Sequence, residues 1–179
     1  MTDLDKIIAQ RKSVRDYKDI PVEVEKIKQI LEAARLAPSA CNKQPWIFVV
    51  ANTPKAKEEV MKFGLGEMMV SNEWAASAPV IIVVCSKKEF ITHSLAEKLQ
   101  GVEYHLIDIG IACQNLVLKA TELGLGTCYI GWFNAKAIKK VLDLPLSYKV
   151  ECLIALGYPK ENNQNQTSRK SMDEISLWK

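Results

Sequence analysis

The sequence has 179 residues, 48% of them hydrophobic, with 24 Lys and Arg against 21 Asp and Glu. This length favours one domain with a sizeable core, and the composition is that of an ordinary globular protein. A formal net charge of only +3, without a basic stripe, argues against nucleic acid or an anionic membrane surface as the partner.

The first part of the chain predicts two amphipathic helices, over residues 3–10 and 21–36. In each, apolar side chains recur at the spacing of a single helix face. Thr2 or Asp3 would cap the first helix, and Pro38 stops the second because proline cannot continue a helix.

A short basic segment lies between these two helices. If it is extended, Arg11, Ser13 and Arg15 point to one side and Val14 points to the other. Two guanidinium groups and a hydroxyl on one side could clamp a phosphate. The alternative is a solvated basic patch, which is the commoner fate of such charges.

A polar loop over residues 37–46 follows the second helix. Pro38 and Pro45 restrict its backbone. Between them lie a hydroxyl, two side-chain amides and an ammonium, all able to bond to a polar ligand. The alternative is a tight polar connector between helix and strand.

Four short runs rich in apolar β-formers predict strands over residues 46–51, 79–85, 127–132 and 149–156. The first two are almost entirely apolar, so we expect them to be buried on both faces. Strands that alternate with helices would by themselves favour a doubly wound parallel sheet.

Three more helices are predicted, over residues 54–63, 103–123 and 134–142. The middle one is apolar on several sides, so it must be buried centrally or against another subunit. Gly124 would end it as a left-handed cap. Asp108 lies on this helix, where it could face a site or cap a packing defect, and a structural role is favoured.

Two segments have no periodic pattern. Residues 64–78 predict a loop or short helical pieces, and residues 87–100 predict a polar surface loop over a site. After Pro159 the tail is first polar and then ends in large apolar residues, which need a surface in the same subunit or a partner. We therefore expect one domain over residues 1–179, with residues 159–179 as a C-terminal docking arm.

The chain has five cysteines, an odd number, and most lie in apolar runs. They predict small buried hydrophobic residues in a reducing compartment. Cys41 is the exception because it lies in the polar loop, but a structural role is favoured there too. The N-terminus has early acidic residues and no apolar run resembling a signal peptide, and no run is long enough to span a bilayer. We expect a cytoplasmic protein.

Several common catalytic signatures are absent from the sequence. It has no glycine-rich dinucleotide fingerprint, no phosphate loop, no nucleophile elbow and no Cys or His pair with metal-ligand spacing. What remains is a binding site without an obvious acid, base or nucleophile. That pattern is typical of a protein whose chemistry belongs to a cofactor.

Four segments in this order resemble the FMN-dependent nitroreductase family: residues 11–15, 37–46, 129–132 and 169–175. The likeness covers nearly the whole chain. It implies an α+β fold with three α-β-α layers and a mixed, mostly antiparallel central sheet, in place of a parallel one. It also implies an obligate homodimer with FMN at the interface.

The resemblance implies that basic and hydroxyl side chains hold the FMN phosphate and ribityl chain. These would be Arg11, Ser13 and Arg15, with Lys12 in the same segment, joined by Arg169 and Lys170 from the tail.

The resemblance also implies contacts to the flavin ring. Pro38 and Ser39 would lie along the ring, and Asn42 would hydrogen-bond to its pyrimidine edge. The backbone around Ile130 and Gly131 would meet the ring near N5, where an N–H donor could stabilise the reduced form. Many relatives carry an acidic residue at the Gly131 position, so a side-chain contact is lost here while a backbone donor is kept.

The implied function is that of an FMN-dependent NAD(P)H oxidoreductase. NADH or NADPH would pass a hydride to flavin N5 and leave, and a nitroaromatic, quinone or activated alkene would then be reduced in the same place. The protein would supply placement and electrostatics rather than a catalytic side chain. The alternatives are a flavin-fragmenting or dehalogenating relative, a non-catalytic flavin-binding protein, and a plain α/β domain with a phosphate-binding patch.

Overall fold

The computed structural model describes residues 1–66, 71–87, 101–160 and 167–179. Much of the two segments without a periodic pattern, residues 67–70 and 88–100, therefore lies outside the described residues. Within the described part of the chain, no helix is long and apolar enough to cross a membrane.

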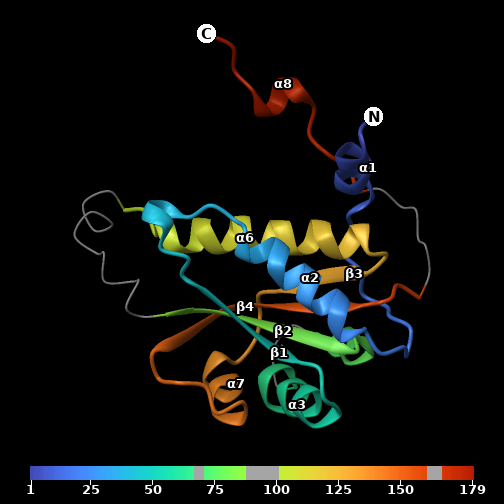
Figure 1. Cartoon of the computed structure of the whole chain (residues 1–179), viewed down its shortest axis with the longest axis vertical. Coiled ribbons are helices and arrows are strands. Elements are labelled where there is room, and N and C mark those ends of the chain that lie inside the picture. The colour runs from blue at the N-terminus through green and yellow to red at the C-terminus, as the bar shows by residue number, and fades with distance from the viewer. Residues whose placement is uncertain (67–70, 88–100, 161–166) are drawn as a thin grey trace.

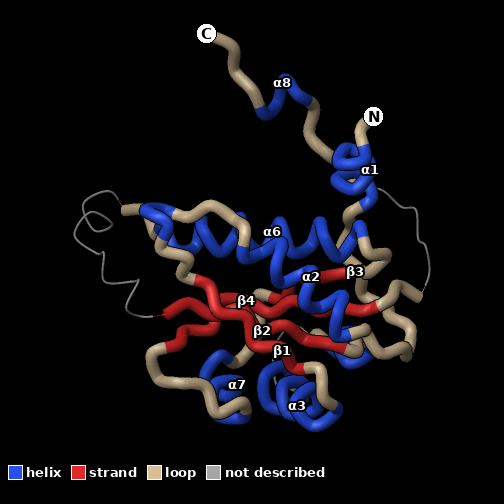
Figure 2. Tube along the Cα trace, viewed as in Figure 1, coloured by secondary structure: helices blue, strands red, loops and turns tan. Residues whose placement is uncertain are grey.

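A four-stranded sheet lies between two layers of helices (Figures 1 and 2). The strand order is β1-β2-β4-β3, and each neighbouring pair is antiparallel. The strands are β1 (Trp46–Ala51), β2 (Val80–Lys87), β3 (Gly126–Ile130) and β4 (Tyr148–Gly157). This confirms the predicted α+β class, whereas the parallel sheet favoured by periodicity alone is wrong.

Helices of different lengths cover the two faces of the sheet. In the view of Figure 1, α2 (Val24–Arg35) and α6 (Tyr104–Glu122) lie above it, and α3 (Pro54–Glu59) and α7 (Ala135–Val141) lie below it. The predicted second helix begins three residues later than expected because Glu23 is still extended. The predicted helix over 54–63 changes at Val60 into a π-helical turn, η2 (Val60–Leu65).

The central strand β2 separates two hydrophobic cores. Val80, Ile82 and Val84 pack in one core with α2 and α6, and Ile81 and Val83 pack in the other with α7. This follows from the two-residue period of a strand, which sends successive side chains to opposite faces. Burial of β2 on both faces is thus confirmed.

Burial on both faces was also expected of β1, and it is only partly observed there. Its end residues Trp46 and Ala51 are buried, but residues 47–50 are half-buried. The physical reason is the position of the strand, since β1 lies at one end of the sheet and pairs with β2 alone among the described strands.

The cysteines largely follow the prediction. Cys85, Cys113 and Cys128 are buried, Cys152 is half-buried and Cys41 is exposed. The long helix α6 also ends as predicted, because Gly124 has a φ of 74°.

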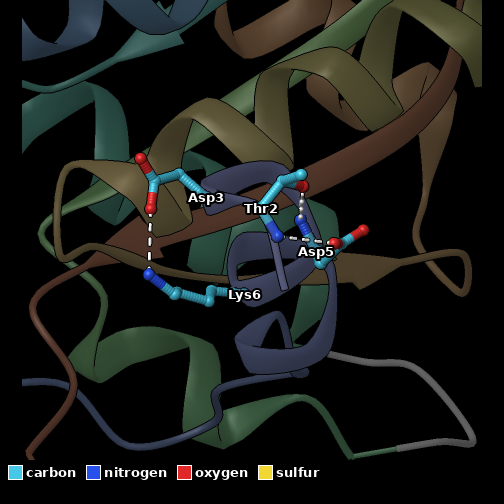
Figure 3. A network of polar contacts seen from close by, with 4 residues as sticks. All are labelled: Thr2, Asp3, Asp5 and Lys6. Carbon is cyan, nitrogen blue, oxygen red and sulfur yellow. Dashed lines mark hydrogen bonds and ion pairs between the residues drawn. The ribbon is translucent and has the colours of Figure 1, made fainter.

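Helix α1 (Asp3–Gln10) begins with a capping box (Figure 3). The Asp5 N–H donates to Thr2 Oγ1 at 3.2 Å, and the Thr2 N–H donates to Asp5 Oδ2 at 2.7 Å. The bond from the Thr2 N–H lowers the pKa of the Asp5 carboxyl, and both bonds satisfy N–H groups at the helix start. The side chains of α1 are nevertheless all outside the core. In Figure 1, α1 and the tail bearing α8 (Met172–Ile175) project from the same end of the molecule.

Candidate functional site

The basic segment after α1 runs alongside β3. Ser13 forms a parallel β-bridge with Thr127, and the Val14 N–H donates to the Thr127 carbonyl at 2.9 Å. Val14 is buried while Ser13 and Arg15 are exposed, so the predicted alternation of side chains is confirmed here. The segment therefore presents a hydroxyl and a guanidinium to solvent from a backbone fixed to the sheet.

Two residues shape the packing of this segment on the sheet. The Tyr17 hydroxyl donates to the Val14 carbonyl at 2.6 Å. Burial raises the pKa of Tyr17, so the hydroxyl stays protonated and able to donate. Gly126 lies directly against Val14, because a Cβ at Gly126 would be 2.6 Å from Val14 Cγ2. The close approach of the segment to β3 thus requires glycine at 126.

The helix η3 (Glu73–Ser77) and Asn72 before it contact the basic segment and the residues after β3. The Arg15 guanidinium carbon lies 5.8 Å from the centroid of the Trp74 ring. Asn72, which is 8% exposed, donates from Nδ2 to the Trp132 carbonyl at 3.0 Å. The sequence alone does not single out Asn72 or Trp74, because their contacts join residues 60 and 59 positions apart.

The end of β3 is open on one side. A Cβ at Gly131 would meet nothing within 4 Å, and the neighbouring rings of Tyr129 and Trp132 are about half exposed. Because Tyr129 is still partly buried, its pKa is raised, and the positive charge of Arg11 opposes that rise. The space beside Gly131 is therefore open to a ligand, and Arg11 adds positive charge near Tyr129.

The polar loop forms a second group. It contains η1 (Ala40–Asn42), and Cys41, Asn42 and Gln44 have φ angles of 49°, 54° and 49°. The Gln44 N–H donates to Ser39 Oγ at 2.9 Å, and Gln44 Nε2 donates to Asn42 Oδ1 at 3.2 Å. Gln44 therefore supports the two residues that were expected to contact a ring.

One side chain of α6 connects the loop to the body of the protein. The Ala40 N–H donates to Asp108 Oδ1 at 3.0 Å, and Asp108 is only 5% exposed. This confirms the expected structural role of Asp108. The loop is thus tied to α6, whereas the basic segment is tied to β3, and the predicted site residues fall into two groups.

Arg169 and Lys170 lie in the tail. Arg169 Nη1 donates to the carbonyls of Thr167 and Ser168 at 3.2 and 3.0 Å, so its contacts lie within its own turn. It stays a prediction that Arg169 and Lys170 bind the same phosphate as Arg11 and Arg15.

A polar cluster, buried apart from Lys149, lies beneath the start of α6. The Ser86 hydroxyl donates to Glu151 Oε1 at 2.6 Å, and Lys149 Nζ is 3.1 Å from Glu151 Oε2. His105 Nε2 is 3.7 Å from the same carboxylate. Glu151 projects here because the strand register shifts between Val84 and Cys85. Among the described residues, no group of three or more His, Cys, Asp or Glu side chains could hold a metal ion.

Comparison with known proteins gives consistent matches. The model of the Nitroreductase family matches residues 8–75 and 65–158. A protein of Archaeoglobus fulgidus with the provisional name NADH dehydrogenase/NAD(P)H nitroreductase is 32% identical over 161 residues, covering 87% of this chain and 85% of the relative. An iodotyrosine deiodinase of Haliscomenobacter hydrossis is 28% identical over 173 residues, covering 84% and 77%.

A solved structure shares the same architecture. The FMN-dependent nitroreductase of Clostridium difficile R20291 superposes with a TM-score of 0.73 and 31% identity, over 93% of this chain and 92% of that one.

Proposed function

Because the chain belongs to the nitroreductase family, we propose that it is an FMN-dependent NAD(P)H oxidoreductase that reduces nitroaromatics, quinones or similar acceptors in a ping-pong cycle. Bound FMN supplies the hydride chemistry, and the chain supplies its placement. The observation that carries this proposal is the group at the end of β3. There, Ser13 and Arg15 on a fixed backbone lie along the strand that leads to the open side of Gly131.

The basic segment is suited to the phosphate and ribityl chain of FMN. Arg11 and Arg15 offer planar guanidinium groups that bond to phosphate in pairs, and Ser13 adds a hydroxyl. Lys12 adds charge in the same segment. Because the β-bridge to Thr127 fixes the backbone, little conformational freedom is lost when the ligand binds. Arg169 and Lys170 would complete the phosphate contacts from the tail.

The flavin ring would lie between the end of β3 and a polar loop. The backbone at Ile130 and Gly131 would face N5, while Pro38, Ser39 and Asn42 would face the ring and its pyrimidine edge. Since the loop is tied to α6 and the basic segment to β3, we infer that a second copy of the chain completes the site.

Exposed apolar side chains support a homodimer with FMN at its interface. Ile8 on α1 is 53% exposed and Ile107 on α6 is 51% exposed, while Leu177 and Trp178 in the tail are 88% and 91% exposed. Large apolar side chains this exposed on α1, α6 and the tail are candidates for burial against a partner. We infer that the partner covers α1 and α6, and that the tail over residues 159–179 docks on the partner.

The absorbance spectrum of the purified protein tests the proposal. We expect a flavin band near that of bound FMN, bleaching of this band by NADH or NADPH without oxygen, and steady oxidation of NAD(P)H with menadione or nitrofurazone. A protein that is colourless and stays so after FMN is added would contradict it. A flavin band that NAD(P)H does not bleach would instead indicate a non-catalytic flavin-binding protein.

Reductive dehalogenation is a second candidate, favoured by the similarity to the deiodinase of Haliscomenobacter hydrossis. It shares the FMN site and differs in the acceptor. Iodide release from iodotyrosine, faster than nitrofurazone reduction at equal concentrations, would support this candidate over the first.

A further inference from the structure

A buried carboxylate on α6 holds the backbone of the polar loop. Asp108 is 5% exposed, and its Oδ1 accepts the Ala40 N–H at 3.0 Å. A carboxylate is costly to remove from water unless it is hydrogen-bonded. Its burial in a mostly apolar helix therefore calls for a reason, and the bond to the loop provides one.

The loop needs such a support because its backbone is unusual. Cys41, Asn42 and Gln44 all have φ near +50°, in the left-handed region that side chains other than glycine rarely adopt. Such residues persist only where the surroundings hold them. The bonds from Gln44 to Ser39 and Asn42 preserve the internal shape of the loop, but they do not set its place on the protein.

We propose that Asp108 is a positioning residue that fixes the polar loop of residues 37–46, and so sets where Ser39 and Asn42 meet a bound flavin. This inference rests on the proposed FMN site. Asp108 would act through the Ala40 N–H without touching the cofactor. Its removal should therefore loosen the loop first and weaken FMN binding as a consequence.

Helix α6 offers a matched control. Asn115 lies two turns further along the same helix and donates from Nδ2 to the Ala33 carbonyl at 3.2 Å. It also ties α6 to the backbone of an earlier segment, but to α2 instead of the loop. Asn115→Ala and Asp108→Ala should each destabilise the protein. Only Asp108→Ala should make the loop more mobile.

Cys41 reports on the loop without any cofactor, because its thiol is exposed and lies within the loop. A spin label on Cys41 should become more mobile in Asp108→Ala than in the wild type. It should keep its mobility in Asn115→Ala and in Asp108→Asn, whose amide oxygen can still accept the Ala40 N–H. Cys41→Ser removes the label from the loop, so any signal that remains in this variant identifies labelling at other cysteines.

Binding of FMN is then measured on the same variants. We expect Asp108→Ala to weaken FMN binding about tenfold, the effect of losing roughly 1.4 kcal/mol, and Asp108→Asn to restore most of it. Equal label mobility in wild type and Asp108→Ala, or equal FMN affinity in both, would overturn the positioning role. A wild type that takes up no FMN would overturn the proposed function, while the label measurement would still decide whether Asp108 holds the loop.

Discussion

The Arg15 guanidinium lies over the indole ring of Trp74, with 5.8 Å between Cζ and the ring centroid. A cation near the face of an indole is attracted to it, and the contact restrains a flexible side chain. Arg15 is thus held near β3 before any ligand arrives. This relationship connects the basic segment to η3, and Asn72 next to η3 connects in turn to the residue after Gly131.

Replacing Arg15 tests its role as a phosphate ligand. Arg15→Met should weaken FMN binding about 10–100-fold, because the charge-assisted hydrogen bond to the phosphate is lost, which is worth about 1.5–3 kcal/mol. Arg15→Lys should fall between this variant and the wild type, since it keeps the charge but not the planar fork. Fluorescence titration measures the affinity. The exposed Arg35, paired with Glu32 on α2, gives the control Arg35→Met, and an equal loss there would contradict the assignment.

A methyl group at Gly126 should push the basic segment off the sheet. In Gly126→Ala the new Cβ would be 2.6 Å from Val14 Cγ2, and overpacking of this kind costs about 1–3 kcal/mol. We expect lower stability in urea together with weaker FMN binding. At Gly110 a Cβ meets nothing within 4 Å, so Gly110→Ala should keep or raise the protomer stability. Unchanged stability in Gly126→Ala would show that the segment can move freely.

The Ser86 hydroxyl should stabilise the buried carboxylate of Glu151. Ser86→Ala removes the donor at 2.6 Å and leaves a buried acceptor less well satisfied, at a cost of about 1–3 kcal/mol. The control is Ser77→Ala, because the Ser77 hydroxyl donates to the Trp74 carbonyl at 2.8 Å in an exposed place. That variant should change the free energy of unfolding by less than about 0.5 kcal/mol. A similar change in the free energy of unfolding for both variants would show that the buried bond to Glu151 stabilises the protein no more than an exposed one.

Alkaline pH should destabilise the protein partly through Cys85. Burial raises the pKa of this thiol from 9.0 to about 12. Above pH 9 the unfolded chain releases the proton while the folded chain keeps it, so stability is full below pH 9 and falls as the pH rises toward 12, by up to about 1.4 kcal/mol per pH unit. Urea unfolding between pH 7 and 11 should show a smaller decline for Cys85→Ala. Cys41→Ala, at an exposed thiol, should decline like the wild type, and identical slopes in all three would refute the assignment.

The apolar end of the tail should hold the homodimer together. Leu177 and Trp178 are 88% and 91% exposed in the protomer, so replacing both with Asp should leave the protomer fold intact. If they dock on a partner, the dimer should weaken by at least about tenfold, since burial of each large side chain contributes about 1.5–3 kcal/mol. Sedimentation measures the association. Leu146→Asp, at an 84% exposed residue in the turn before β4, should not change it; a monomeric wild type would contradict the proposed dimer.

Local patterns predicted much of the secondary structure and part of the site. The bounds of α1, α6 and α7 were predicted within a residue or two from capping residues, helical periodicity and Gly124. These signals act between near neighbours along the chain. The alternation of Ser13, Val14 and Arg15 was predicted in the same way and holds in the structure.

Long-range contacts had no such local signal. The strand runs were visible, but their antiparallel order and the edge position of β1 follow from how the whole chain packs. For the same reason, the sequence indicated Arg15 and the polar loop as candidates but not Trp74, the support of Arg15. It indicated a structural role for Asp108 without showing that Asp108 holds the loop.

Propensity and chemical type are properties of single residues, so the sequence predicts which residues can form helices and strands and which side chains can bind a phosphate and a ring. The contact of Arg15 with Trp74 and that of Asp108 with Ala40 follow from the assembled fold. These contacts join residues 59 and 68 positions apart, and such pairs meet only when the sheet and both helix layers have assembled around their cores.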